Sequence, residues 1–139
     1  MQDETVVTSE IEGGCLCGAV RYGVGGTPLY STICHCCSCR KASAAPAVAW
    51  LTFERDRFRI LRGAPQSFAS SPGVLRCFCG RCGSQLTYTS TRRSTHIDIT
   101  TASLDDPTRF PPLMEVWLED RLHWMRVEPS RKQYAHGGD

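Results

Sequence analysis

The sequence predicts a mainly β fold, and three observations support this prediction. Apolar residues alternate with polar ones over many short stretches, as in strands with one buried face. Glycine and proline punctuate the chain at short intervals, with 12 glycines and 8 prolines in 139 residues. No long segment shows the 3.6-residue apolar period of a helix. At this length the chain is most simply one domain with a core of its own.

The expected strands follow one another with little helix between them. An alternating stretch at 13–22 opens the fold, with glycines on either side of a Cys-x-Cys pair. The alanine-rich stretch at 41–45, which Pro46 stops, is where we expect a brief helix. The remaining strands are expected at residues 29–33, 47–53, 57–61, 67–70, 74–78, 85–89 and 95–102.

The overall composition is that of an ordinary globular protein, with 41% hydrophobic and 22% charged residues. No apolar run approaches the roughly 20 residues that span a bilayer, so no membrane partner is expected. The first four residues are Met-Gln-Asp-Glu and lack the basic and then apolar pattern of a secretory signal. A cytoplasmic location is therefore expected.

Nine cysteines are the strongest compositional signal. In a reducing compartment they favour metal binding over disulfides, and their odd number disfavours a complete disulfide framework. Zinc-bound thiolates would also lower the formal net charge from +2 to about −1, if one four-thiolate and one three-thiolate site were filled. Because the chain also lacks a basic run, no nucleic-acid partner is expected.

Cys79 and Cys82, followed by Gly83, form the clearest metal-binding motif. In such a zinc knuckle the backbone amides of the turn face the sulfurs, and the glycine supplies a positive φ. The knuckle provides two of the four ligands of a tetrahedral site. Cys15 and Cys17 are the expected complement, because residues two apart on a strand share a face. A closed four-sulfur site of this kind is structural.

A second cluster lies at residues 34–41, which read Cys-His-Cys-Cys-Ser-Cys-Arg-Lys. Cys34, Cys36 and Cys39 offer three thiolates, the pattern of a zinc whose fourth position is open to water or substrate. The alternative is a second closed structural site, and spacing alone leaves both open. Redox use is disfavoured, because the flanks lack the strand and long helix of a thioredoxin-like motif. The candidates for a fourth protein ligand are Cys37, Cys77 and His35.

Four motifs form a joint pattern over nearly the whole chain, from about residue 13 to residue 124. They read Gly14-Cys15-x-Cys17-Gly18-x-Val20-x-Tyr22, Cys34-His35-Cys36-x-x-Cys39-Arg40-Lys41, Phe78-Cys79-x-x-Cys82-Gly83-Ser84-x-Leu86 and Asp98-x-Thr100-x-x-Ser103-Leu104-Asp105-Asp106-Pro107. This pattern resembles the glutathione-dependent formaldehyde-activating enzyme family, which also includes centromere protein V.

The resemblance implies a β-tent fold of small, bent antiparallel sheets around two zinc ions. The matching residues are Cys15, Cys17, Cys79 and Cys82 for a structural zinc, and Cys34, Cys36 and Cys39 for a catalytic zinc. Cys37 and Cys77 fall where the family pattern has no ligand, so we expect a thiol near the open site and a strand-packing residue, respectively. The zinc-binding β domain is expected at 13–126, between a flexible N-terminus at 1–12 and a flexible tail at 127–139.

The resemblance also implies a reaction, the condensation of glutathione with formaldehyde to S-hydroxymethylglutathione and its reversal. The expected activity is therefore that of a zinc-dependent carbon–sulfur lyase, whose partners are a small-molecule thiol such as glutathione and an aldehyde. Arg40 and Lys41, next to the cluster, are the expected anchors for a substrate carboxylate, with solvated surface charge as the alternative. For Arg92 and Arg93 we favour surface charge.

Several other residues near the motifs have expected roles. His35 would face away from the sulfurs of its neighbours, in a supporting or solvent-facing position. We expect His96 at a strand or surface position, and core packing for Trp117 and Trp124 rather than a pocket wall. Many members of the family have a histidine at the place of Glu115, so their substrate specificity is not carried over to this chain.

Two other functions remain open from the sequence. The first is a non-catalytic binding module with two structural zincs, which the centromere relative suggests. The second is a metal or oxidant sensor, in which Cys37 forms a disulfide when zinc leaves. Metal stoichiometry and geometry separate the first from an enzyme: two fully protein-ligated zincs favour the module, whereas a water or small ligand on one zinc favours the enzyme.

Overall fold

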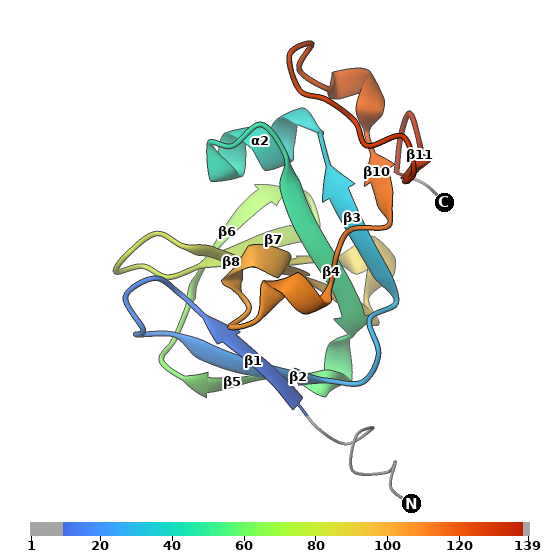
Figure 1. The fold of residues 1–139 in the computed structure, drawn as a ribbon. Helices are drawn as coiled ribbons and strands as arrows, with labels where there is room; N and C mark the ends of the chain where they lie inside the picture. Colours follow the sequence, from blue (N-terminus) through green and yellow to red (C-terminus); the bar gives the residue numbers. More distant parts are fainter. Residues whose placement is uncertain (1–9, 138–139) are drawn as a thin grey trace, which may run out of the picture.

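Two β-sheets and one short α-helix make up residues 10–137, the part of the chain that the computed structural model describes (Figure 1). The mainly β prediction is therefore confirmed. Within these residues no helix is long and apolar enough to cross a bilayer. The strands are β1 Glu10–Gly14, β2 Arg21–Gly25, β3 Tyr30–Cys34, β4 Val48–Glu54, β5 Phe58–Arg62, β6 Gln66–Ser71, β7 Val74–Phe78, β8 Gln85–Ser90, β9 His96–Thr100, β10 Met114–Val116 and β11 Lys132–Gln133. The helices are α2 Cys37–Ser43 and the 3-10 helices η1 Arg55–Arg57, η2 Thr91–Arg93, η3 Thr101–Ser103, η4 Pro107–Arg109 and η5 Leu118–Asp120.

The two sheets differ in size and in strand direction. The small sheet has the order β1-β2-β5 and is antiparallel throughout. The large sheet has the order β11-β10-β3-β4-β9-β8-β7-β6, in which β10 runs parallel to both β3 and β11. The expectation of small antiparallel sheets therefore fails for the large one. The reason is the long connection after β9, which returns the chain to β3 in the direction of β3.

The large sheet has one face in the hydrophobic core. Along β4, Leu51 and Phe53 have no exposed surface and share a core cluster with Tyr22 and Val24 of β2. The neighbouring Trp50 belongs to a separate cluster that contains two cysteines. Because side chains alternate along a strand, β4 supplies the core on one face and a second environment on the other.

Most expected strands are confirmed within one or two residues, but the first is not. The stretch at 13–22 forms the end of β1 and the start of β2, with a turn at 15–20 between them. The turn forms because Gly18 adopts φ 81° and because its amide donates to the Cys15 carbonyl at 3.2 Å. Cys15 and Cys17 therefore lie on a turn and not on one face of a strand.

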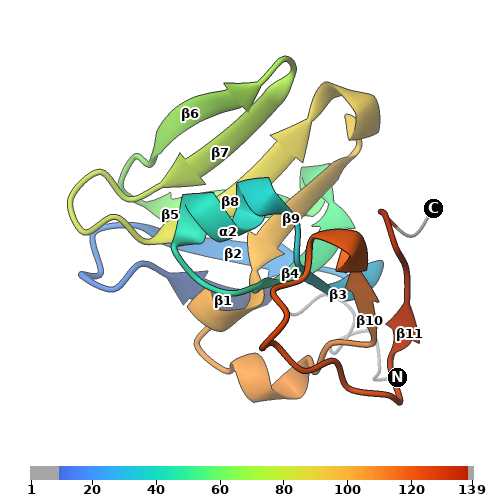
Figure 2. The same ribbon diagram turned by 90° about the horizontal axis from the view of Figure 1, so that it is seen from above.

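The helix also differs from its predicted place at 41–45, because it begins four residues earlier. Cys36 is its N-cap, and the Cys36 sulfur accepts a hydrogen bond from the amide of Cys39 at 3.3 Å. The helix ends where Ala44 adopts φ 56°. It lies across one face of the large sheet, as Figure 2 shows from above.

The end of the described chain is part of the fold. Its composition predicts a flexible tail at 127–139, yet residues 132–133 form β11 beside β10. The amide of Tyr134 donates to the Glu115 carbonyl at 3.0 Å, and the amide of Trp117 donates to the His136 carbonyl at 2.7 Å. The flexible N-terminus expected at 1–12 falls mostly outside the described residues, and β1 begins at Glu10.

Candidate metal centres and the adjoining pocket

Seven of the nine cysteines gather into two groups, as the sequence predicts, and all nine thiols are free. Within each group the sulfur atoms lie within 4.8 Å of one another. Soft thiolate donors brought this close are the donor set that zinc prefers in proteins. Both groups are therefore positioned to bind a metal ion. The first contains Cys15, Cys17, Cys79 and Cys82, and the second contains Cys34, Cys36 and Cys39.

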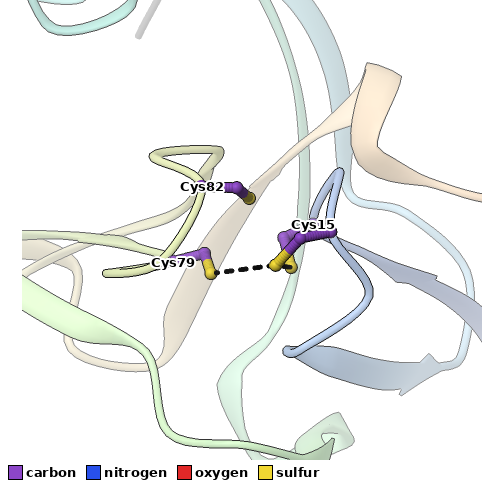
Figure 3. Close-up of side chains that lie close together, drawn as sticks. Cys15, Cys79 and Cys82 are labelled. Carbon is purple, nitrogen blue, oxygen red and sulfur yellow. Dashed lines mark hydrogen bonds between the residues drawn. The ribbon is translucent and has the colours of Figure 1, made fainter.

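The four-cysteine group joins two loops that are far apart in the sequence (Figure 3). The turn after β1 carries Cys15 and Cys17, whose sulfurs are 3.7 Å apart. The loop after β7 carries Cys79 and Cys82, and the sulfurs of Cys17 and Cys79 are 3.8 Å apart. A metal ion bound here would therefore connect the small sheet to the large one.

Backbone amides face the sulfurs of this group from both loops. The amide of Val20 donates to the Cys15 sulfur at 3.2 Å, and the amide of Arg81 approaches the Cys79 sulfur at 3.4 Å. Gly83 adopts φ 83°, which is strained for any other residue. These contacts confirm the geometry predicted for a zinc knuckle.

Ser84 connects the two loops directly. Its hydroxyl accepts a hydrogen bond from the amide of Leu16 at 2.9 Å and lies 3.3 Å from the Cys82 sulfur. The Ser84 hydroxyl, together with backbone amides, lowers the pKa of Cys82 to about 5. A thiolate at this position is therefore favoured at neutral pH, as metal binding requires.

The three-cysteine group forms where β3 meets α2. Cys34 is the last residue of β3, Cys36 caps the helix, and Cys39 lies one turn into it. Cys34 and Cys39 are buried, with 7% and 5% of their surfaces exposed, whereas Cys36 is half-buried. The short link between a strand end and a helix cap therefore brings three sulfurs of one chain segment together.

Three sulfurs so close cannot all be thiolates unless a cation joins them. Hydrogen bonds from the Cys34 and Cys39 thiols lower the pKa of Cys36 to about 2. The hydrogen bonds of Cys34 with Cys36 and then with Cys39 raise the pKa of Cys34 far above its usual range. The protein alone thus favours one thiolate in this group, and a divalent cation would supply the charge that stabilises all three.

A pocket of about 330 Å³ opens beside the three-cysteine group, on the face of the large sheet opposite the core. A row of residues directly opposite one another on neighbouring strands lines it. The cysteines, two tryptophans and further side chains complete the wall. The row is Tyr30, Thr52, Asp98, Tyr88 and Arg76 from β3, β4, β9, β8 and β7.

The pocket contains a guanidinium that a buried carboxylate holds in place. Arg93 donates to Asp98 at 2.5 Å, and the hydroxyl of Thr52 donates to the other oxygen of the same carboxylate. The side chain of Asp98 is 11% exposed, whereas that of Arg93 is 34% exposed. No other side-chain hydrogen bond of Arg93 occurs within residues 10–137. Its remaining N–H groups are therefore free to bind an anion in the pocket.

A buried acid–base network supports the cysteine loop from behind. His35 and Glu115 are 0% and 1% exposed, and the imidazole Nε2 lies 2.6 Å from a Glu115 oxygen. Arg131 donates to the second oxygen at 2.8 Å. Burial raises the pKa of Glu115, but these hydrogen bonds outweigh it and hold the pKa below its usual value. The network connects the loop to the C-terminal segment.

The structure places the predicted anchors differently from the expectation. Arg40 and Lys41 do not line the pocket, and Lys41 is exposed. The lining cations are Arg93, which the sequence assigns to the surface, and Arg76, which sequence reasoning missed. The sequence feature that could have identified Arg76 is its place in the alternating strand at 74–78. The alternation does not show which face of that strand lines the pocket, because this depends on the order of the strands in the sheet.

The aromatic residues also divide differently. Trp117 lines the pocket and adopts φ 58°, a strained conformation for a bulky residue. Trp124 is 71% exposed and belongs to neither the core nor the pocket. His96 lines the pocket, and its Nδ1 is buried without a partner among the described residues. His35 is fully buried in the supporting role that was one of its two expected positions.

Three comparisons show which known proteins this chain is similar to. A sequence profile described as "Glutathione-dependent formaldehyde-activating enzyme" matches residues 10–120. A Halomonas elongata protein described as "Putative glutathione-dependent formaldehyde-activating enzyme" is 31% identical over 134 residues, covering 88% of this chain and 83% of the relative. A crystal structure of a Rhodobacter sphaeroides protein is similar with a TM-score of 0.60 and 19% identity, over 89% of this chain and 99% of that one. The last likeness concerns the fold alone.

Proposed function

The chain belongs to the family of glutathione-dependent formaldehyde-activating enzymes, and from this premise we propose that it is a zinc-dependent carbon–sulfur lyase. Its substrate would be a thiol–aldehyde adduct of the S-hydroxymethylglutathione type. The observation that carries the proposal is the pocket, which joins three convergent thiols to a fixed guanidinium. The same proposal includes a cytoplasmic location and the β-tent fold that the resemblance implies, with the parallel strands β10 and β11 added to its antiparallel strands.

Each cysteine group has a separate role in this proposal. Four sulfurs complete a tetrahedral site, so the group at Cys15 would hold a structural zinc. The group at Cys34 supplies only three, which leaves the fourth place to the substrate sulfur. Zinc bound there supplies the positive charge that favours a thiolate near neutral pH.

The reaction needs no oxidant or reductant. In the lyase direction the carbon–sulfur bond of the adduct breaks, its hydroxyl becomes the aldehyde carbonyl, and the hydroxyl proton is lost. The released sulfur keeps the electron pair and regains one proton in solution. The protein therefore has to hold the sulfur and the rest of the substrate in place while this bond breaks.

The pocket walls suit a substrate with an acidic group distant from its sulfur. Arg93 presents free N–H donors, and the carboxylate of Asp98 fixes its orientation. A carboxylate such as those of glutathione would bind these donors. Trp50 and Trp117 line the same pocket and exclude water from the reacting atoms.

The test measures how fast the zinc-loaded protein interconverts glutathione, formaldehyde and their adduct, by exchange NMR spectroscopy. We expect exchange faster than the uncatalysed rate, and two zinc ions per chain by elemental analysis. Replacement of Arg93 with Gln should raise KM about 10-fold or more, the size of a lost charge-assisted hydrogen bond. The matched control is Arg92→Gln, because Arg92 is exposed and outside the pocket lining.

Two results would contradict the proposal. One is a zinc-loaded protein that neither turns over nor binds thiols across a panel of thiol and aldehyde pairs. The other is a second zinc that is fully ligated by protein side chains, which would favour a non-catalytic binding module. An equal loss in Arg92→Gln and Arg93→Gln would remove Arg93 from the substrate contacts.

A further inference from the structure

Arg76 is a buried cation beside the three-cysteine group. It lies at the centre of β7 and is 7% exposed. Both terminal nitrogens of its guanidinium are 3.8 Å from the Cys39 sulfur, and its Nε donates to the Ser70 hydroxyl at 3.1 Å. The guanidinium also lies 5.0 Å from the ring centroid of Tyr88. Four neighbouring contacts therefore fix its position.

Arg76 has no carboxylate partner among the described residues, although a carboxylate is the usual counter-ion of a buried arginine. None of the ion pairs formed by residues 10–137 involves Arg76. A buried charge without a counter-ion is strongly disfavoured, because the protein interior does not replace the lost hydration. The nearest group able to carry the opposite charge is the sulfur of Cys39. Negative charge on the three-cysteine group would therefore compensate the buried guanidinium.

The net charge of the three-cysteine group with a metal ion bound explains the role of Arg76. A divalent ion with three thiolates has a formal charge of about −1, and a fourth, substrate thiolate adds another negative charge. An anion that approaches an anionic centre in a partly buried pocket is repelled. A guanidinium fixed next to one of the thiolates makes the centre neutral overall before the substrate arrives.

We propose that Arg76 is the built-in counter-ion of the three-cysteine metal centre and the residue that makes it receptive to an anionic sulfur ligand. This inference rests on the proposed function, because it concerns how the same site accepts a thiolate. Arg76 acts through Cys39 and through the charge of the centre, so it is a positioning residue. The four-cysteine group, which has backbone amides and no buried arginine, needs no such residue because it binds no further anion.

The test compares Arg76→Met, which removes the charge, with Arg76→Lys, which keeps it. The 139-residue chain is loaded with cobalt(II) and titrated with 2-mercaptoethanol, while the cobalt–thiolate absorption is recorded. We expect the affinity of Arg76→Met to fall about 10- to 100-fold, the effect of removing a unit charge a few ångströms away. Arg76→Lys should recover most of this loss.

A neutral ligand separates charge from packing. 2-(Methylthio)ethanol is one methyl group larger than 2-mercaptoethanol but brings an uncharged thioether in place of a thiolate, so its affinity by calorimetry should change less than about threefold. Metal content and the thermal midpoint verify that each variant is folded and loaded. Equal binding of 2-mercaptoethanol by Arg76→Met and the unmodified chain would overturn the inference, and so would an equal loss in Arg76→Met and Arg76→Lys.

The choice of 2-mercaptoethanol keeps this test independent of the proposed substrate. If glutathione does not bind but 2-mercaptoethanol binding depends on Arg76, the substrate is wrong and the counter-ion stands. If glutathione turns over equally well in Arg76→Met, the proposed function stands and the counter-ion fails. If no thiol changes the cobalt spectrum of the unmodified chain, both fail.

Discussion

The two cysteine groups use similar donors in different surroundings. In the four-cysteine group, two loops contribute the sulfurs, and backbone amides of Val20 and Arg81 face them. In the three-cysteine group, one strand-to-helix link contributes the sulfurs, and the guanidinium of Arg76 faces them. Backbone amides stabilise thiolates without adding net charge. A guanidinium stabilises them too, and it also adds one positive charge. In the proposed function, this counter-charge distinguishes the centre that remains closed from the centre that accepts an anion.

The two cysteine groups also differ in their position relative to the hydrophobic core. The four-cysteine group connects the two sheets across the edge of the core, so its loss should affect the whole domain. The three-cysteine group lines a pocket on the face of the sheet away from that core. Its loss should leave most of the packing intact.

Replacement of Cys79 with Ser should cost the most stability. It removes one ligand of the group that connects the sheets, and structural zinc sites can contribute on the order of 10 kcal/mol to folding. We expect loss of cooperative thermal unfolding and of at least one zinc per chain, measured by circular dichroism and elemental analysis. Cys77→Ser is the matched control, because Cys77 is half-buried and belongs to neither group. A Cys79→Ser variant that keeps two zincs and its thermal midpoint would contradict the contrast.

Replacement of Cys36 with Ser should abolish turnover while the fold persists. This residue caps α2 and contributes one of three sulfurs, so the second zinc should be lost. Serine can still cap the helix, which limits the loss of stability. The neighbouring Cys37 is exposed and outside both groups, so Cys37→Ser should keep activity within about twofold. If Cys36→Ser unfolds the chain as Cys79→Ser does, the two groups do not differ as described.

Replacement of Glu115 with Gln should weaken the support behind the three-cysteine loop. The variant leaves a buried histidine and Arg131 without their carboxylate, which should lower the free energy of unfolding by about 2–4 kcal/mol. The folded-state pKa of Glu115 lies below its unfolded value. The contribution is therefore fully present above the unfolded pKa and is lost as the pH falls through the folded pKa.

Denaturant unfolding of both proteins between pH 7 and pH 3 tests this prediction. The stability difference between the unmodified chain and Glu115→Gln should shrink as the pH falls. A difference that stays constant over this range would mean that the carboxylate is not what stabilises the network. The four-cysteine group should retain its zinc at pH 7 in both proteins.

Replacement of Asp105 with Asn should have the smallest effect. Asp105 accepts two hydrogen bonds from Arg21, which follows the turn that carries the four-cysteine group. Both side chains are partly exposed, so the pair should contribute only about 0.2–1 kcal/mol. The Arg21 hydrogen bond lowers the pKa of Asp105, so this contribution disappears as the pH falls through that lowered value. A loss of zinc in this variant would show that the turn depends on the pair.

Local patterns predicted the strands and the grouping of the cysteines well. Alternation located β4 and β7, and the knuckle spacing located Cys79, Cys82 and the positive φ of Gly83. The predictions that proved wrong did so for physical reasons. The turn at 15–20 depends on hydrogen bonds to one sulfur and one carbonyl, which an alternating pattern does not reveal.

The composition of the pocket was not predictable, because it depends on strand order. Arg76 and Asp98 are more than 20 residues apart in the sequence, and Tyr88 lies between them. The three side chains meet only because β7, β8 and β9 are neighbours in the sheet. Adjacency to the cluster in the sequence predicts Arg40 and Lys41 as anchors. Yet the helix that carries them presents Cys39 to the pocket and leaves them outside its lining.

The alternation along β4 separates two kinds of substitution. Leu51 and Phe53 belong to the core, whereas Trp50 and Thr52 line the pocket. Substitution of Trp50 or Thr52 would therefore change the pocket lining and leave in place the core residues that hold the two sheets together. Insertion of a single residue before Trp50 would exchange the two faces of β4. Core residues would then face the pocket and pocket residues the core, so both stability and specificity would be damaged.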